Sequence, residues 1–161
     1  MAYQVYITVT GTKQGTFKGG VMEKGREGKI KAIAVSYGVS IPRDNASGLA
    51  IGKRVQKPVS FSLEWDICSP LFFNAAFTNE TLKNVTIEYY GTGRDGLTKV
   101  DHTVVLTNAS IADITESYAA VVNGTADGRD IQTVTVTFQK IAITSNTGNT
   151  TAVDDWNSPA V

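Results

Sequence analysis

The sequence predicts a mainly β fold: a small two-sheet β-barrel or sandwich with one flanking α-helix, at about residues 69–80, and a long extended loop, at about residues 42–58. Three observations lead to this prediction. Apolar and polar residues alternate with a period of two along most of the chain, which is typical of strands packed on one face. A single segment after Pro70 loses this alternation. A stretch of seventeen residues between two predicted strands has no sustained period at all.

Size and composition are those of one compact domain. The chain has 161 residues and 17.2 kDa; 42% of its residues are hydrophobic and 19% are charged. This composition supports a packed core and a single domain over residues 1–161. Lys and Arg together number 15, as do Asp and Glu, so the net charge is zero. We therefore expect neither nucleic acid nor membrane insertion, whereas a near-zero charge favours self-association.

The amino terminus predicts a strand and not a targeting signal. Residues 1–10 alternate polar and apolar side chains and lack the basic segment and apolar run of a secretory signal peptide. No run of eighteen apolar residues occurs, so the sequence predicts no transmembrane helix. We expect a protein made in the cytoplasm, without a cleavable signal peptide, and soluble on synthesis.

Five strands follow from the alternation. The first has four apolar residues on one face: Tyr3, Val5, Ile7 and Val9. Residues 29–41 are apolar at both parities, so we expect this strand to be covered on both faces. The remaining three are predicted around residues 59–65, 85–89 and 104–106. Near the carboxyl terminus the apolar parity changes around Gln139 and Lys140, which predicts either a bulge or the start of a new strand.

One helix is predicted directly after Cys68. Ser69 can act as its N-cap, and Pro70 suits the first helical position. The apolar residues that follow have helical spacing and predict one stripe buried against a sheet: Leu71, Phe72, Ala75, Ala76 and Phe77.

The segment from Pro42 to Pro58 is the candidate functional element. It is longer than the loops of compact domains normally are, and it mixes cationic with apolar side chains. We expect it to be an arm that reaches another subunit; an ordinary mobile connection between two strands is the alternative. Deletion of residues 45–54 is expected to leave a folded chain. The candidate contact residues are Arg43, Asp44, Asn45, Leu49, Ile51, Lys53, Arg54, Gln56 and Lys57.

No set of residues predicts catalysis, a cofactor or a metal site. Residues 91–96 match the GxGxxG pattern of dinucleotide-binding loops, but a strand is predicted after them where a helix would be needed, so we interpret them as a hairpin turn. Cys68 and His102 are the only residues of their kinds, and we interpret both as structural. A reactive thiolate at the helix start is the alternative for the cysteine. Asp154 and Asp155 are interpreted as a solvated terminal turn.

Several segments along the chain carry a family resemblance when taken in order: residues 41–42, 57–61, 66–70, 79–90, 105–111, 136–143 and 154–156. Their order and spacing resemble the haemolysin-coregulated protein family, Hcp, of type VI secretion systems. The resemblance covers essentially the whole chain. It rests on the ordered set, since no single motif in it is specific.

Two positions depart from the family pattern. Family members often carry His where Gln56 stands, and Trp where Ile143 stands. Neither change threatens the fold, because Gln56 is predicted in a loop and Ile143 keeps a bulky apolar side chain. Gln56 does put a pH-sensitive role of that position in doubt.

The resemblance implies a structural and export role. Six copies would close head-to-tail into a ring, and rings would stack into the hollow inner tube of the secretion system. The implied partners are further copies, the VgrG spike, the contractile sheath and the baseplate, with small effector proteins in the lumen. The protein itself would leave the cell through the apparatus. Two alternatives are a monomeric ligand-binding β-barrel, which requires an apolar internal pocket, and a contractile-phage tail-tube protein.

Overall fold

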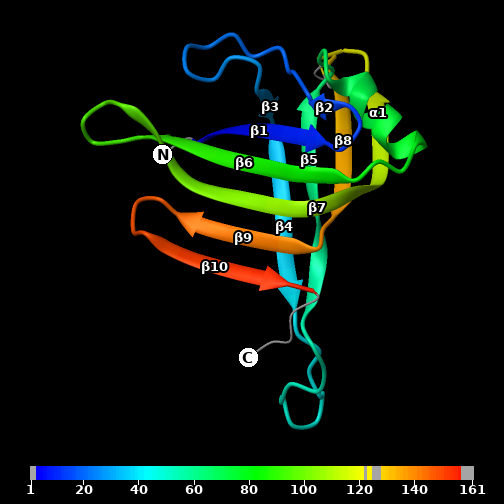
Figure 1. Cartoon of the computed structure of the whole chain (residues 1–161), viewed down its shortest axis with the longest axis vertical. Coiled ribbons are helices and arrows are strands. Elements are labelled where there is room, and N and C mark those ends of the chain that lie inside the picture. Colours follow the sequence, from blue (N-terminus) through cyan, green and yellow to red (C-terminus); the bar gives the residue numbers. More distant parts are fainter. Residues whose placement is uncertain (1–2, 122, 125–127, 157–161) are drawn as a thin grey trace.

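A computed structural model describes residues 3–121, 123–124 and 128–156 and shows two crossed layers of antiparallel strands with one helix beside them (Figure 1). The strands are β1 (Gln4–Gly11), β2 (Gly15–Thr16), β3 (Ile30–Ala32), β4 (Ala34–Ser40), β5 (Val55–Glu64), β6 (Leu82–Thr92), β7 (Thr98–Tyr118), β8 (Asp130–Thr137), β9 (Lys140–Ser145) and β10 (Thr150–Asp155). The helix α1 spans Ser69–Phe77. The prediction of a mainly β fold with one helix is confirmed.

The first layer, which we call the platform sheet, consists of β1, β6, residues 98–109 of β7, β9 and β10, with the short strands β2 and β3 beside β1. All neighbouring strands are antiparallel. One row of residues in register across its inner face is entirely apolar: Ile30, Ile7, Ile87, Val104 and Ile143. This face forms one wall of the core.

The second layer, the arm sheet, consists of β4, β5, β8 and residues 110–118 of β7. Its strands cross those of the platform sheet (Figure 1). Along β5 and β8, alternate side chains are fully buried against the platform sheet: Val59, Phe61, Leu63, Val134 and Val136. The core therefore lies between the two layers.

Two chain segments pass from one layer to the other. Residues 98–109 of β7 pair with β6, whereas residues 110–118 pair with β8. In the same way, β3 pairs with β1 and the following β4 pairs with β5. The strand order, β2-β1-β6-β7-β8-β5-β4, is open. Of the two predicted forms, the fold is therefore a sandwich with barrel-like corners and not a closed barrel.

One aromatic side chain, Phe72, links the helix to both layers. The ring of Phe72 lies 5.2 Å from that of Phe17 and 5.8 Å from that of Phe61, so the helix joins both layers. Phe77, by contrast, is 81% exposed and does not extend the buried stripe. The N-cap is Cys68, one residue earlier than predicted, and the hydroxyl of Ser69 instead accepts the N–H of Asp66 at 2.9 Å. The helix ends three residues before the predicted residue 80.

The prediction that residues 29–41 are covered on both faces is wrong for the single chain. The segment is divided into β3 and β4, and Ile33, Val39 and Ile41 are exposed. The physical reason is position, because β4 is the last strand of the arm sheet and continues into the hairpin that leaves the sandwich, where the platform sheet no longer covers its side chains. Its apolar composition therefore signals a surface that this chain alone does not bury.

The predicted bounds of the long loop, 42–58, are also wrong at one end. The chain between β4 and β5 spans residues 41–54, and β5 contains Gln56, Lys57 and Pro58. Pro58 is tolerated in a strand because it follows Lys57, where a register shift interrupts the β4 ladder, and because pairing with β8 begins only at Val59.

Two further predictions on local structure are confirmed. The parity change at Gln139 and Lys140 is the start of a new strand, since β8 ends at Thr137 and β9 begins at Lys140. The glycine-rich residues 91–96 belong to the hairpin between β6 and β7: Gly91 and Thr92 end β6, and Gly96 in the turn that follows has the positive φ of 77° that such turns require.

Candidate assembly interface

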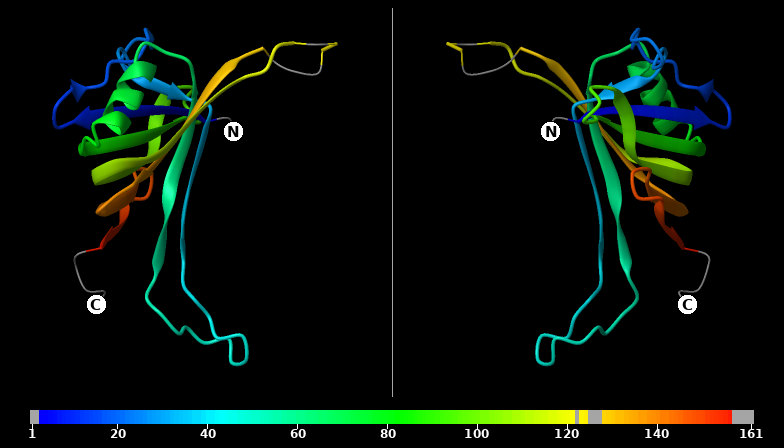
Figure 2. Two further views of the ribbon diagram at one scale, coloured as in Figure 1. Left: turned by 90° about the vertical axis from the view of Figure 1, so that its right-hand side faces the viewer. Right: turned by 90° about the vertical axis from the view of Figure 1, so that its left-hand side faces the viewer.

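The β4–β5 hairpin projects far from the sandwich and ends in the segment 41–54, which we call the arm (Figure 2). Its tip is ordered by a turn in which the N–H of Asp44 donates to the carbonyl of Leu49, and the N–H of Gly48 donates to the carbonyl of Asp44, both at 2.8 Å. The Asp44 carboxylate also accepts the Ser47 hydroxyl at 2.6 Å, which lowers the pKa of Asp44. The arm therefore ends in a hydrogen-bonded turn and is not an irregular connection.

The arm presents apolar side chains that the core does not use. Leu49 is 67% exposed and Ile51 is 66% exposed, and the cations Arg43 and Lys53 lie on the same short hairpin. A tip that is ordered by its own hydrogen bonds and still exposes two large apolar side chains is typical of a contact surface.

The root of the arm is pinned to the last strand of the platform sheet. Asp154 accepts hydrogen bonds from Arg54 Nε at 2.7 Å and from Gln56 Nε2 at 2.6 Å. Arg54 also donates to the carbonyl of Asp155 at 3.3 Å. The hydrogen bond from Arg54 lowers the pKa of Asp154. The interpretation of Asp154 and Asp155 as a solvated turn is therefore wrong: both belong to β10, and the first anchors the arm.

The structure divides the nine predicted contact residues into two groups. Seven lie on the arm: Arg43, Asp44, Asn45, Leu49, Ile51, Lys53 and Arg54. Gln56 and Lys57 lie behind it on β5. Of the seven, Arg54 faces inward to its partner on β10, so the arm divides into an outward tip and an inward root.

The arm sheet has two edges along which the described residues form no ladder. β4 pairs with β5 alone, and residues 110–118 of β7 pair with β8 alone. Exposed strand edges can form hydrogen bonds with a further strand, and natural proteins usually cover them. Sequence reasoning missed this feature, because which strand ends a sheet depends on pairing between distant segments and leaves no local signal.

The outer face of the arm sheet is lined by hydroxyl groups. Ser62 and Thr133 lie side by side with their oxygens 3.0 Å apart, and neighbouring residues extend the pattern: Ser60, Ser110, Thr115, Thr135 and Thr137. Asp113 adds a carboxylate to this face. We call these eight residues the hydroxyl face.

Cys68 and His102, which the sequence analysis weighed as reactive residues, are packed structural side chains. Cys68 is buried, and burial raises the pKa of its thiol to about 12, so the alternative of a reactive thiolate is wrong. The ring of His102 stacks on that of Tyr89 at 4.0 Å, and its Nδ1 lies 2.9 Å from the carboxylate of Asp101. Both interpretations as packed side chains are confirmed.

The cavities do not favour a ligand-binding barrel. The space between the sheets holds a continuous apolar core. A hollow of about 250 Å³ lies between the β4–β5 hairpin and β9–β10, but the side chains of Val39 and Val153 on its rim are exposed to solvent.

Within the described residues, no helix is long and apolar enough to cross a membrane.

Comparisons with known proteins agree with one another. The family model described as "Type VI secretion system effector, Hcp" matches residues 6–144. The "Major exported protein" of Pseudomonas aeruginosa is 34% identical over 169 aligned positions, which cover 99% of this chain and 98% of that protein. A crystal structure of an Hcp protein superposes with a TM-score of 0.89 at 27% identity, over 98% of this chain and 100% of the other. The structure of Hcp1 from E. coli EAEC 042 superposes with a TM-score of 0.85 at 26% identity, over 96% of this chain and 99% of the other.

Proposed function

Because the chain belongs to the Hcp family of type VI secretion proteins, we propose that it is the subunit of hexameric rings that stack into the hollow inner tube of such a system. It is a structural and export protein and not an enzyme. Small effector proteins travel in the lumen, and the tube subunits leave the cell with them.

The observation that carries this proposal is the pair of free edges on the arm sheet. Neighbouring strands in the sheet alternate in direction, so β4 and residues 110–118 of β7, at opposite ends of four strands, run in opposite directions. β4 of one copy can therefore pair antiparallel with β7 of the next. The two surfaces are different, so the contact is head-to-tail, and such a contact closes into a ring when its rotation divides the circle.

The same geometry accounts for a bore. Six copies with four strands each, spaced by about 4.8 Å, give a circumference of about 115 Å and a diameter of roughly 37 Å between backbones. The core side of the arm sheet is already covered by the platform sheet, so the hydroxyl face is the surface left to line this bore. Seven of the eight residues of this face carry uncharged hydroxyl groups, which suit a channel through which different proteins must pass without tight binding.

The arm serves the contact between rings. It points along the strands of the arm sheet and beyond the body of the subunit (Figure 2), so it extends past the ring to which its own chain belongs. The expected remaining partners are the VgrG spike at the end of the tube, and the contractile sheath and baseplate around it. Synthesis in the cytoplasm and export through this apparatus, without a cleavable signal peptide, complete the proposal.

Light scattering after size-exclusion chromatography, with negative-stain electron microscopy, tests the ring. The expected result is a particle of about six times 17.2 kDa with an annular image. Val39→Glu puts a charge on the free β4 edge and is expected to abolish the ring, whereas Leu97→Glu is the matched control, since the two side chains are 53% and 59% exposed. A wild-type protein that stays at 17.2 kDa at high concentration contradicts the proposal.

A further inference from the structure

Three residues with side-chain oxygens lie together near the last rungs of the β7–β8 ladder: Glu116, Asp130 and Gln132. Gln132 stands directly opposite Glu116 in the register, and Asp130 comes two residues before Gln132 on the same strand. Directly opposed residues and residues two apart share one face of a sheet, so the three side chains project to the same side. This is the side on which Val134 and Val136 are buried. We call the three residues the oxygen cluster.

Two oxygen atoms of the cluster are buried and have no hydrogen-bond partner in the described part of the chain: Asp130 Oδ1 and Gln132 Oε1. Gln132 is fully buried, and its Nε2 donates to the Ser69 carbonyl at 3.3 Å. The planar amide therefore turns Oε1 away from Ser69, and the carboxylates of Glu116 and Asp130 are its polar neighbours on this face. Because a buried acceptor without a partner costs free energy, native proteins satisfy nearly all of them.

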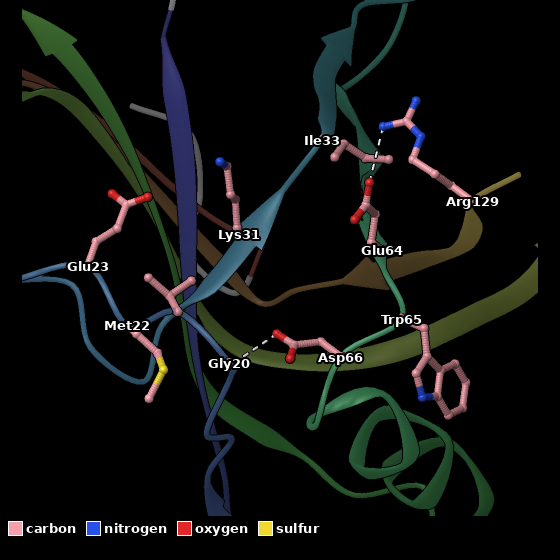
Figure 3. Close-up of a pocket in the computed structure, with 10 residues that line it drawn as sticks. Gly20, Met22, Glu23, Lys31, Ile33, Glu64, Trp65, Asp66 and Arg129 are labelled. Carbon is pink, nitrogen blue, oxygen red and sulfur yellow. Dashed lines mark hydrogen bonds and ion pairs between the residues drawn. The ribbon is translucent and has the colours of Figure 1, made fainter. Parts of the chain in front are cut away.

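The two carboxylates of the cluster also require a positive partner. Glu116 and Asp130 are in hydrogen-bond contact with each other, and two ionised carboxylates repel at this distance. Arg129 precedes Asp130 in the chain but lies on the other face of the sheet, 3.2 Å from Glu64 (Figure 3). A shared proton joins one oxygen of each carboxylate and leaves the orphaned oxygens of Asp130 and Gln132 without a partner. A divalent cation satisfies all of them at once.

We propose that the oxygen cluster is a Ca²⁺ site, in which Glu116, Asp130 and Gln132 supply the protein ligands. Calcium takes about six to eight oxygen ligands in flexible geometry and accepts carboxylates together with amide oxygens. The exposed side of Glu116 lets water complete the shell. The charges of the two carboxylates balance the charge of one Ca²⁺. Mg²⁺ fits less well, because it demands a near-ideal octahedron that three side chains on one pair of strands do not supply.

The neighbouring acidic hollow is not a second site of this kind. It has a volume of about 500 Å³, lies at the end of β5 (Figure 3) and is lined by three carboxylates: Glu23, Glu64 and Asp66. Each of these has a partner, since Arg26 lies 3.0 Å from Glu23, Arg129 lies 3.2 Å from Glu64, and the N–H of Gly20 donates to Asp66 Oδ2 at 2.9 Å. The orphaned acceptors distinguish the oxygen cluster from this hollow.

A cation in the cluster links the free edge of the arm sheet to the strand behind it. Glu116 lies on the edge segment of β7, whereas the other two ligands lie on β8. Three side-chain ligands, one of them exposed, predict weak binding with a Kd of about 10⁻⁴–10⁻³ M, the range of extracellular calcium modules. Occupancy after export rests on the proposed function, but binding of Ca²⁺ itself does not.

Isothermal titration calorimetry of the full chain with CaCl₂, in chelator-treated buffer at about pH 8, tests the site. We expect one Ca²⁺ per chain in this affinity range and a Tm higher by at least about 3 °C in about 10 mM CaCl₂. Glu116→Gln is expected to weaken binding by about tenfold or more. Asp113→Asn is the matched control, because it removes one negative charge from an exposed position of the same strand on the opposite face, and it should leave the Kd unchanged.

The remaining outcomes each decide a point. A wild-type protein that gives neither heat nor a change of Tm with CaCl₂ overturns the site, and so does equal weakening by the two substitutions. Binding of MgCl₂ as tight as that of CaCl₂ overturns the assignment to calcium. Rings that form in the presence of chelator support the proposed tube whatever the titration shows. A monomer that binds Ca²⁺ supports the site and contradicts the tube.

Discussion

At the scale of single residues, the structure turns on contacts between positions far apart in the chain. Arg54 and Asp154 are separated by a hundred residues, and their pairing converts a surface hairpin into an extension of the sandwich. The sequence predicted a long segment between two strands, and seven of the nine residues it named lie on the arm. It could not predict the pin, because nothing local distinguishes Arg54 from Lys53 as the cation that turns inward.

Replacing Arg54 by alanine is expected to loosen the root of the arm and leave the core intact. The pair is partly exposed, so we expect a fall in Tm of no more than about 4 °C, together with faster amide exchange around residues 54–56. Lys53→Ala is the control and should change neither quantity. Equal effects of the two substitutions would contradict the role of the pin.

The pH dependence of this pin has a definite sign. The pKa of Asp154 is lowered from 3.8 in the folded chain, chiefly by the hydrogen bond from Arg54, so its contribution to stability is present above that value. It is lost as the pH falls through the lowered pKa. Asp154→Asn should remove this acid-side loss, as measured by thermal unfolding between pH 2 and pH 6.

A second group with a shifted pKa is Glu116, in the part of β7 that pairs with β8. Burial, and then the hydrogen bond with Asp130, raise the pKa of Glu116 to about 7. A raised carboxyl pKa means that the folded chain holds a proton that the unfolded chain releases above 4.5. The stabilisation is therefore complete below that value and is lost as the pH rises through about 7.

Glu116→Gln keeps a hydrogen-bond donor toward Asp130 at every pH and is expected to flatten this loss. The effect should be below about 1 kcal/mol, because the desolvation of the Glu116 carboxyl is only partial and most of the side chain stays open to solvent. Urea unfolding of both proteins from pH 5 to pH 8 measures it. A wild-type profile that is flat over this range would show that the two carboxyl groups do not share a proton.

At the scale of elements, alternation predicted the strands of the sandwich and misjudged the burial of β4, the last strand of the arm sheet. Residues 29–41 are apolar at both parities, which predicted cover on both faces, but the structure leaves Ile33, Val39 and Ile41 exposed. The helix was predicted from Pro70 and the apolar spacing, and its early end came from Asn79, which adopts the left-handed conformation at φ 51°. Glu80 beyond it is buried and accepts the N–H of Gln14 at 3.2 Å, a contact that no local pattern encodes.

The helix gives a sharp test of the core. Phe72→Ala removes a fully buried ring that contacts both Phe17 and Phe61, and is expected to lower the free energy of unfolding by about 3–5 kcal/mol. Phe77→Ala, on the same helix but 81% exposed, should stay within about 0.5 kcal/mol. Urea unfolding at one fixed chain concentration compares them, since assembly would stabilise the folded state.

The arm can be removed in two ways that the structure distinguishes. Replacing residues 44–51 by a short Gly-Ser linker keeps Arg54, and is expected to leave Tm and the ring unchanged while stacking of rings is lost. Deleting residues 45–54 should also leave a folded chain, but with the additional loss of the pin to Asp154. Electron microscopy counts rings per stack, and a linker variant that still forms long tubes would show that the arm is dispensable.

At the scale of the whole molecule, the described part of the chain leaves three surfaces uncovered: the two outer edges of the arm sheet and the tip of the arm. A protein with near-zero net charge has little repulsion to keep such surfaces apart. The fold is thus complete in its core and incomplete at its borders, which is what an assembling subunit requires. The near-zero net charge of the sequence predicted a tendency to self-associate, but only the strand order shows which sheet edges are uncovered.

The bore is tested by the size of reagents that enter it. Thr137 is exposed on the hydroxyl face, so Thr137→Cys should react with a small maleimide in every state of the protein. Once rings are stacked, a maleimide on a polymer wider than roughly 37 Å, the diameter expected for twenty-four strands, should be excluded. Leu97→Cys, equally accessible on the hairpin between β6 and β7, should react with both reagents throughout. Because urea-dissociated protein must regain full labelling at both positions, exclusion that persists in urea would point to local burial of residue 137 and not to a closed wall around the lumen.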